Sequence, residues 1–245
     1  MYPENSLLRK HPCQPRAIAV QNGMANKKGI PLSAGMVERR MAEFGFVFPV
    51  AVAEGICIYL ELLEKWNAVM NLVGFSHWED ILEKLICDSF HLESFLSGLP
   101  LSAEPEVWDL GAGAGLPGIP LRLVWQKGEY AMVEVREKRA LFLRTALAAC
   151  KTPRTRVVQA RAEDFFLTAG QASLVISRAF MPWRKMLALV QERLTEDGMV
   201  VFLALTPLPP DLPAGWRALE ERHYRAGGQD RHFWALRRTY GERHA

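Results

Sequence analysis

The fold is decided by residues 107–120, VWDLGAGAGLPGIP. An apolar run ends in Asp109, a glycine-rich turn follows, and a helix-like segment comes next. Glycine permits sharp turns and lets a ligand lie against bare main chain. In open α/β sheets, ligands bind beyond the carboxyl ends of the strands, where this turn would lie. The stretch therefore predicts an α/β fold with a ligand site at the turn.

Short apolar runs alternate with helix-like segments after Pro105. The runs occupy residues 106–110, 130–134, 156–159, 173–177 and 199–205, and the helix-like segments occupy 119–125, 138–149 and 183–194. This alternation predicts βαβ units, and hence a parallel sheet with helices on both faces. Two further runs, 217–224 and 232–238, have no long helix between them. They predict an antiparallel pair at the edge of the sheet.

The first hundred residues have a different character. Residues 1–30 show no hydrophobic period and contain three prolines and two glycines, which predicts a poorly ordered tail. Met24 is an alternative translation start, and in that case residues 1–23 are not native. From residue 31 to 100 the apolar side chains follow helical spacing. The predicted organisation is therefore a tail (1–30), a helical region (31–100) and an α/β domain (101–245).

Composition limits the classes of protein to which the chain can belong. Hydrophobic residues make up 49% and charged residues 23% of the chain, which is typical of globular proteins and not of disordered or collagen-like ones. No apolar run reaches the roughly 18 residues of a membrane span, and no signal peptide is recognisable. The four cysteines are far apart, which argues against a zinc site and fits a reducing compartment. We expect a cytoplasmic protein with no membrane association and no bound metal.

Two classes of cofactor fit the glycine-rich turn. Its last three glycines, Gly113, Gly115 and Gly118, match the GxGxxG fingerprint of dinucleotide-binding proteins, with Glu134 at the end of the next run. Its first three glycines, preceded by Asp109, match the acid-x-GxGxG turn of S-adenosylmethionine (AdoMet) enzymes. An acid directly before the turn suits a cationic amino-acid ligand and would repel a pyrophosphate, which favours AdoMet. In either class Glu134 would hold ribose hydroxyls through its carboxylate oxygens.

Residues 108–120 resemble the cofactor loop of the RsmG (GidB) family, AdoMet-dependent methyltransferases of small-subunit ribosomal RNA. Other segments resemble the family's motifs in the family's order, and the stretch 161–165 resembles its acidic loop after the third strand. The remaining matches are Lys65-Trp66-Asn67 with Asn71-Leu72, Asp88-Ser89, Lys138-Arg139 with Phe142-Leu143-Arg144, Ile176–Phe180, and Asp230-Arg231-His232. The ordered set covers about residues 36–240 and is much more specific than the turn alone.

The resemblance implies a Rossmann-like, seven-stranded class I methyltransferase sheet with an N-terminal helical extension. It implies AdoMet as cofactor, and methyl transfer to guanine N7 in the decoding-region loop of 16S ribosomal RNA. Guanine N7 has a free lone pair and no proton, so alignment suffices and we expect no catalytic dyad. The partner would be small-subunit ribosomal RNA or the 30S subunit, and we expect a monomer. The predicted cofactor-binding residues are Asp109, Gly111, Gly113, Gly115, Leu116, Glu134, Ala162, Glu163 and Arg178.

Charge is unevenly distributed within a total of +3. Residues 136–161 hold eight Lys or Arg and one acid, a net +7, while residues 78–106 hold seven acids and one Lys, a net −6. Such a basic cluster indicates either a polyanionic partner or a solvated face balanced by the acidic stretch. The charge count leaves both interpretations open. The predicted RNA-binding residues are Arg136, Lys138, Arg139, Arg144, Arg178 and Arg231.

Two positions depart from the family's pattern. Leu85 stands where relatives commonly have His, and Thr206 lies where they usually have Lys. These departures keep open a ribosome-associated module that keeps the fold without activity, and the GxGxxG match keeps open an oxidoreductase with a nicotinamide cofactor. Two residues of the matched motifs also have a purely structural interpretation. Trp66 on an apolar helix is more often a core residue than a platform for a base, and Asn67 is of a type that satisfies backbone groups near a helix end.

Overall fold

The computed structural model describes residues 31–239, so the predicted tail (1–30) lies outside the described residues, as do residues 240–245. The helices are α1 (Ala34–Glu43), α2 (Val50–Met70), α3 (Trp78–Ile81), a π-helical turn (Leu82–Ile86), α4 (Cys87–Gly98), α5 (Gly118–Val124), α6 (Glu137–Cys150), α7 (Ala162–Thr168), α8 (Trp183–Val190) and a 3₁₀ turn (Gln191–Arg193). The strands are β1 (Glu106–Leu110), β2 (Glu129–Val133), β3 (Thr155–Val158), β4 (Ala172–Arg178), β5 (Leu194–Ala204), β6 (Trp216–Ala226) and β7 (Gln229–Arg238).

The strands form one seven-stranded sheet in the order β3-β2-β1-β4-β5-β7-β6. Neighbours among the first five strands are parallel, and β7 is antiparallel to both β5 and β6. The α/β prediction and the antiparallel pair at the sheet edge are confirmed. Gly227 and Gly228 both have positive φ (57° and 74°) in the short β6–β7 connection, as the turns that suit the twist of a hairpin require.

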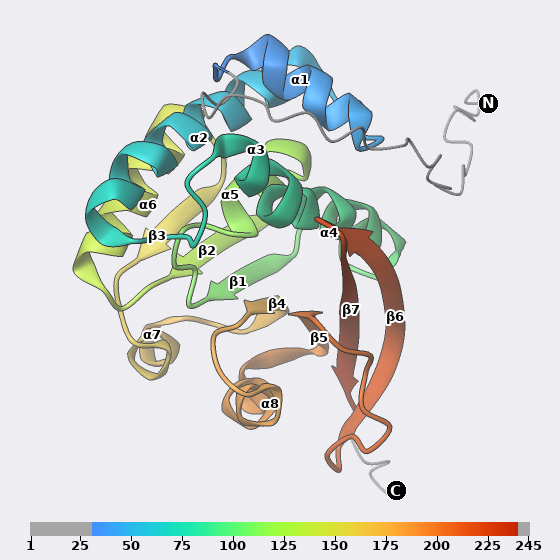
Figure 1. Cartoon of the computed structure of the whole chain (residues 1–245). Coiled ribbons are helices and arrows are strands. Elements are labelled where there is room, and N and C mark those ends of the chain that lie inside the picture. Colours follow the sequence, from blue (N-terminus) through green and yellow to red (C-terminus); the bar gives the residue numbers. More distant parts are fainter. Residues whose placement is uncertain (1–30, 240–245) are drawn as a thin grey trace, which may run out of the picture. The chain divides into compact units, whose positions relative to one another are not determined.

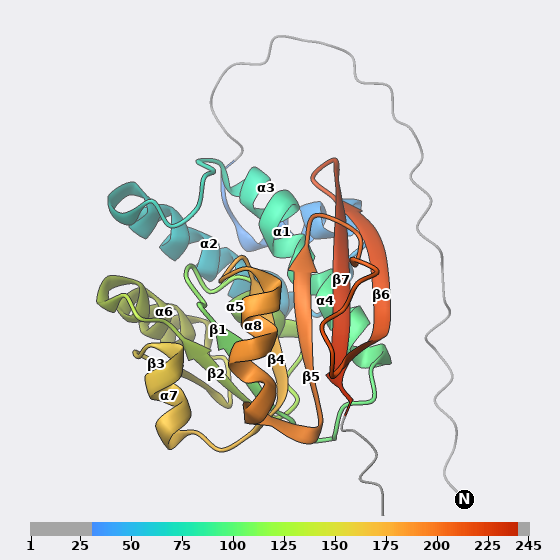
Figure 2. The ribbon, with the colours of Figure 1, turned by 90° about the horizontal axis from the view of Figure 1, so that it is seen from below.

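Side chains alternate between the two faces of the sheet, and a different group of helices packs on each face. Val107 of β1 belongs to the core shared with α2, α4, α5 and α6, whereas Trp108 belongs to the core shared with α7 and α8. Figure 1 shows these two groups of helices above and below the sheet. From below, Figure 2 shows β3 and β6 at its two edges. The ends of β1 and β4 therefore lie in the middle of the fold.

The predicted helical region, residues 31–100, corresponds to α1–α4, and its buried side chains join the same core as one face of the sheet. Trp66 packs against Phe142 of α6, with ring centroids 5.8 Å apart. Trp66 is half-buried and packs against the edge of the core. Within residues 31–239, no helix combines the length and the apolar character needed to cross a membrane.

One local prediction needs correction. The stretch 161–165 is not a loop, because α7 begins at Ala162. Phe165 and Phe166 of α7 both pack on the indole of Trp108, with ring centroids 4.9 and 5.5 Å away. Burial of these aromatic rings stabilises a short helix, and the two acids of its first turn are the side chains that resembled an acidic loop.

Candidate active site

The glycine-rich turn lies at the carboxyl end of β1 and is tied to the neighbouring strand. The backbone N–H groups of Gly111 and Ala112 donate to the carbonyl of Val133, at 2.9 and 3.1 Å. Gly111 has a φ of +74°, and a Cβ there would lie 2.3 Å from the Phe180 ring. Position 111 therefore requires glycine both for its conformation and for the close approach of Phe180.

Two residues of the helical region hold the other side of this turn. Tyr59 of α2 donates its hydroxyl hydrogen to the carbonyl of Ala114 at 2.7 Å. Ser89 of α4 donates to the carbonyl of Pro117 at 3.0 Å. The bond from Tyr59 satisfies a carbonyl group of the turn's irregular backbone, whereas the carbonyl of Pro117 also accepts the backbone N–H of Leu121 at 3.0 Å, so Ser89 gives it a second bond. The N-terminal helices thus support the shape of the turn.

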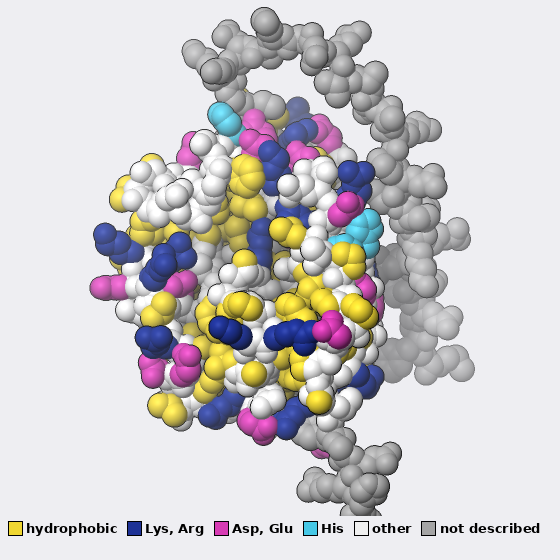
Figure 3. All heavy atoms as spheres, turned by 60° about the horizontal axis from the view of Figure 1, so that its bottom comes forward, with side chains coloured by type: hydrophobic (Ala, Val, Ile, Leu, Met, Phe, Trp, Pro, Cys, Tyr) yellow, Lys and Arg dark blue, Asp and Glu magenta, His cyan; other side chains and the backbone are white. Residues whose placement is uncertain are grey.

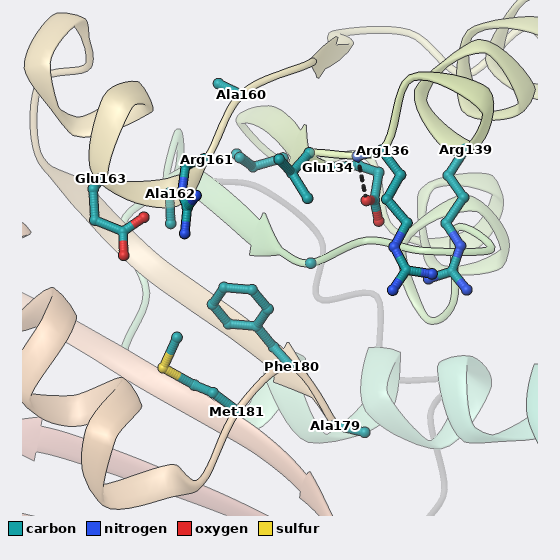
Figure 4. A pocket seen from close by; sticks show the side chains of 13 residues that line it. Glu134, Arg136, Arg139, Ala160, Arg161, Ala162, Glu163, Ala179, Phe180 and Met181 are labelled. Atoms are coloured by element: carbon teal, nitrogen blue, oxygen red, sulfur yellow. Dashed lines mark hydrogen bonds between the residues drawn. The ribbon is translucent and has the colours of Figure 1, made fainter.

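The first cavity has a volume of about 550 Å³ and opens beside the turn, where β1–β4 end. In Figure 4, Ala162 and Glu163 lie on one side of it, Arg136 and Arg139 on the other, and Phe180 and Met181 between them. Its lining residues are Gly111, Val133, Glu134, Val135, Arg136, Arg139, Ala160, Arg161, Ala162, Glu163, Ala179, Phe180 and Met181. The cavity therefore joins the turn to residues that are distant in sequence.

Glu134 follows β2 and is held in place from two sides. Its Oε2 accepts the backbone N–H of Gly113 at 3.0 Å. Its Oε1 accepts the backbone N–H of Arg136 at 2.8 Å, the dashed line in Figure 4. The residue is buried yet lines the first cavity. Because each carboxylate oxygen has two lone pairs, both retain capacity for a ligand's hydroxyl groups. Glu134 is thus an oriented acceptor at the middle of the cavity.

The second cavity, of about 320 Å³, lies across the turn from the first and shares Gly111, Arg139 and Ala179 with it. The loop after α2 forms one of its walls. Its lining residues are Leu72, Val73, Gly74, Phe75, Leu85, Gly111, Ala112, Gly113, Ala114, Leu116, Arg139, Arg178 and Ala179. Apolar side chains and two guanidinium groups therefore meet in this cavity.

Asn67 fixes the loop that walls the second cavity. Its Oδ1 accepts the backbone N–H of Val73 at 2.8 Å, and its Nδ2 donates to the carbonyl of Phe75 at 3.1 Å. The prediction that Asn67 satisfies backbone groups near a helix end is confirmed. Those backbone groups belong to the cavity wall, so the bonds also shape the site.

Arg178, the last residue of β4, is paired with a buried carboxylate. Its Nη2 lies 3.3 Å from Oδ2 of Asp88, and the hydroxyl of Tyr224 donates to Oδ1 at 3.0 Å. Arg231 lies behind them, with Nε 4.0 Å from Oδ1. Burial raises the pKa of Asp88, while the two guanidinium groups and the Tyr224 hydroxyl act to lower it. A carboxylate within the apolar stretch 86–90 was the signal of this pairing in the sequence.

Five of the predicted cofactor residues do not line the first cavity, and three of these, Gly113, Leu116 and Arg178, line the second cavity only. Asp109 is buried beneath the turn, where its Oδ2 accepts the hydroxyl of Tyr130 at 3.2 Å, and it lines neither cavity. Burial raises the pKa of Asp109 to about 7. Gly115 packs against Ile119 and Leu143. Long-range packing, not the order of residues in the motif, decides these positions.

The predicted RNA-binding residues divide into three places. Arg136 and Arg139 line the first cavity, and Lys138 and Arg144 are exposed on α6 without lining either cavity. Dark blue side chains lie on the left of the face in Figure 3, where α6 runs. Arg178 and Arg231 lie largely buried beside Asp88, and Nη2 of Arg231 donates to the carbonyl of Lys84 at 3.3 Å. The six residues therefore do not form one surface.

The two departures from the family's pattern also lie in different places. Leu85 lines the second cavity, and its half-buried side chain adds to the apolar wall. Thr206 lies beyond β5 and lines neither cavity, while its carbonyl accepts the indole N–H of Trp234 at 3.1 Å. Only the departure at position 85 therefore changes the wall of a cavity.

Known proteins resemble the chain over most of its length. The family described as rRNA small subunit methyltransferase G matches residues 53–205. The chain belongs to this family. A ribosomal RNA small subunit methyltransferase G from Nitratidesulfovibrio vulgaris (strain DP4) is 56% identical over 197 residues, which cover 80% of this chain and 89% of the relative. One from Oleidesulfovibrio alaskensis is 45% identical over 216 residues, which cover 84% and 94%.

Membership in the rRNA small subunit methyltransferase G family confirms the resemblance found in the sequence. It also decides between the two cofactor classes in favour of AdoMet, the methyl donor, and against a nicotinamide dinucleotide. The solved structure of MtNAS in complex with MTA and tNA is 12% identical, with a TM-score of 0.54 over 84% of this chain and 76% of that one. At that identity the likeness concerns the fold alone.

Proposed function

We propose that the protein transfers the methyl group of AdoMet to N7 of a guanine in the decoding-region loop of 16S ribosomal RNA. One observation carries this proposal: two cavities of different character meet at Gly111. The first has an oriented carboxylate, and the second has apolar walls and two guanidinium groups. A methyl donor in one and a nucleotide in the other would face each other across the turn.

The first cavity fits AdoMet, which supplies an electrophilic methyl group on a sulfonium centre. Glu134 would accept hydrogen bonds from the ribose hydroxyls, because its oxygens keep free lone pairs beside the cavity. Ala162 offers a small surface to the adenine, and Glu163 an acceptor for its exocyclic amine. The bare main chain at Gly111 admits a ligand where any Cβ would collide with Phe180.

The second cavity suits a guanine base. Leu72, Phe75 and Leu85 provide apolar walls for the base, and the guanidinium group of Arg178 is a donor for the O6 edge or a phosphate. Guanine N7 carries a lone pair and no proton, so the protein would accelerate transfer by alignment and by its electrostatic field. Its residues would hold the base and exclude water, with no proton to move.

The wider surroundings of the site support RNA as substrate. Arg136 and Arg139 at the rim would contact phosphates of the RNA or of the 30S subunit, and exposed Lys138 and Arg144 would add to the positive potential that attracts it. The protein would work as a cytoplasmic monomer on this partner. Asp109, Gly113, Gly115 and Leu116 would shape the turn around the donor.

The direct test is incubation of the full chain with unmodified 30S subunits and radiolabelled AdoMet, followed by mapping of 7-methylguanine. We expect one labelled guanine. Glu134→Ala should weaken AdoMet binding by about 1.5–3 kcal/mol, as expected for charged hydrogen bonds. Glu137→Ala, an exposed acid on the first turn of α6, is the matched control. AdoMet binding without any methylation would instead favour a ribosome-associated module that has kept the fold and lost activity.

A further inference from the structure

Asp88 joins four elements of the fold at one carboxylate. It belongs to α4, while its partners Arg178, Tyr224 and Arg231 belong to β4, β6 and β7. Only 2% of Asp88 is exposed. The next residue, Ser89, holds the glycine-rich turn through the carbonyl of Pro117. The start of α4 is therefore coupled both to the turn and to the end of β4.

The charges around Asp88 do not balance. One carboxylate faces two guanidinium groups, so a net positive charge remains in a largely buried place. Nη1 of Arg178 is buried and has no hydrogen-bond partner among the described residues. Buried donors are nearly always paired in native proteins, and Arg178 lines the second cavity. Both observations point to an anionic group that completes the cluster when the site is filled.

The Asp88–Arg178 contact also restricts the guanidinium group. Arginine presents several donors from one rigid plane, so a partner on Nη2 fixes the direction of Nη1. Without Asp88 the side chain would retain its charge and lose its orientation. Asp88 would then matter for activity through Arg178, although it lines neither cavity.

We propose that Asp88 is a positioning residue for methyl transfer, whose carboxylate holds Arg178 so that the guanidinium group binds an oxyanion at the second cavity. This inference rests on the proposed function and extends it. The oxyanion is either the phosphate beside the target guanine or the carboxylate of AdoMet's methionine. Both present the same chemistry to Arg178, and binding measurements distinguish them.

The test is a double-mutant cycle in the full chain with Asp88→Asn, Arg178→Ala and both together. Each single change should lower kcat/KM for unmodified 30S subunits by about 10- to 100-fold, the range for a lost charged hydrogen bond. The double variant should be no worse than Arg178→Ala within about twofold, because Asp88 acts through Arg178. Losses that multiply would overturn the proposal, since a merely structural Asp88 would act independently.

Two binding measurements identify the oxyanion. Calorimetry with AdoMet alone and filter binding with unmodified 30S subunits should be run on the wild type and on each variant. A roughly tenfold or larger loss of AdoMet affinity indicates the methionine carboxylate, and a similar loss of affinity for 30S subunits indicates the phosphate. If neither affinity changes in Asp88→Asn, the proposal is wrong. Asp80→Asn, another acid paired with a cation but outside both cavities, is the control and should leave both affinities unchanged.

Failure of this inference is distinguishable from failure of the proposed function. Wild-type protein that does not methylate 30S subunits contradicts the function, while the two binding measurements still test Asp88. If Asp88→Asn does not fold, as thermal melting will show, Arg178→Lys takes its place. A lysine keeps the charge without the planar fork, so wild-type kcat/KM in that variant would overturn the proposal.

Discussion

Two sets of guanidinium groups surround the glycine-rich turn, and they differ in how they are held. Arg136 and Arg139 line the first cavity, and neither side chain forms an ion pair with the described residues. Arg178 and Arg231 are largely buried and lie against Asp88. Among the described residues the first set therefore has no carboxylate partner, whereas the second set lies against one.

This difference separates two uses of the same side chain. A solvated guanidinium contributes attraction that salt screens, and its exact geometry matters little. A buried one must be compensated, and its hydrogen bonds then have a fixed direction. We therefore assign attraction of the RNA to the α6 set and alignment at the reacting atoms to the set around Asp88.

The largest expected effect concerns stability. Asp88→Asn leaves two buried guanidinium groups without their carboxylate, and loss of one partner of a buried ion pair costs about 3–5 kcal/mol. Arg136→Gln, at an exposed position, should change the free energy of unfolding by less than about 0.5 kcal/mol, as is usual for surface substitutions. Urea denaturation of both variants near neutral pH measures the difference. Equal small losses would show that the two sets are held alike.

The second expected effect concerns geometry. Arg178→Lys should lower kcat/KM for 30S subunits by about 10- to 100-fold, because an ammonium group does not reproduce the planar fork. Arg139→Lys keeps the charge that attracts RNA, so its kcat/KM should stay within about threefold of wild type. Steady-state methylation assays measure kcat/KM for both variants and for the wild type. A larger loss for Arg139→Lys would mean that the α6 set also needs defined geometry.

The third effect concerns salt. Changing both Arg136 and Arg139 to Gln should reduce the slope of log affinity for RNA against log salt by roughly one to two, because each phosphate contact contributes about 0.7 to 0.9. The matched pair Lys138→Gln/Arg144→Gln lies on the same helix outside the cavities. Filter binding at several salt concentrations compares the two. An equal reduction would extend the RNA-binding surface over the whole face of α6.

The smallest effect is a shift in pH dependence. Burial raises the pKa of Asp109 to about 7, and the charge of Arg178 is among the influences that lower it. The unfolded-state pKa is about 3.9, so the folded state binds the proton more tightly. Stability contributed by the protonated form is therefore lost as pH rises from about 4 to about 7, by up to about 1.4 kcal/mol per pH unit.

Arg178→Ala removes a charge that lowers the pKa of Asp109, so the loss of stability with rising pH should extend to higher pH. Arg139→Gln should leave the pH range of that loss unchanged. Urea denaturation between about pH 5 and pH 8 measures the free energy of unfolding for each variant. Asp109→Asn, which lacks the titrating group, supplies the baseline to be subtracted. An unchanged profile in Arg178→Ala would mean that Arg178 is too well solvated to influence Asp109.

Most of the sheet was predictable because its signals are local. The apolar runs match β1–β5, and the paired runs near the C-terminus match β6 and β7, with boundaries that differ by only a few residues except at β5. That strand begins at Leu194, where the helix of 183–194 had been predicted to end. The helix stops at Val190 and a 3₁₀ turn follows, a boundary that hydrophobic period does not reveal.

The site was predictable in part. Gly111, Glu134, Ala162 and Glu163 meet in the first cavity. The order of strands and turns in an α/β sheet leads one to expect this for Gly111 and Glu134, whereas Ala162 and Glu163 were implied by the family resemblance. Asp109 belongs to the same motif, but it is buried beneath the glycine-rich turn, where it accepts a hydrogen bond from Tyr130. Whether a side chain at the end of a strand faces a ligand or the core depends on packing that the motif does not encode.

By itself, the sequence determined the βαβ order, the glycine-rich turn, the acid after β2 and the basic face of α6. These are properties of neighbouring residues: hydrophobic period, freedom of the backbone at glycine, and local charge. Only the tertiary structure decided that Asp88 meets Arg178, Tyr224 and Arg231, whose positions are up to 143 residues further along the chain. The physical reason is desolvation, because a buried charge selects its partner from whatever the folded chain brings within reach.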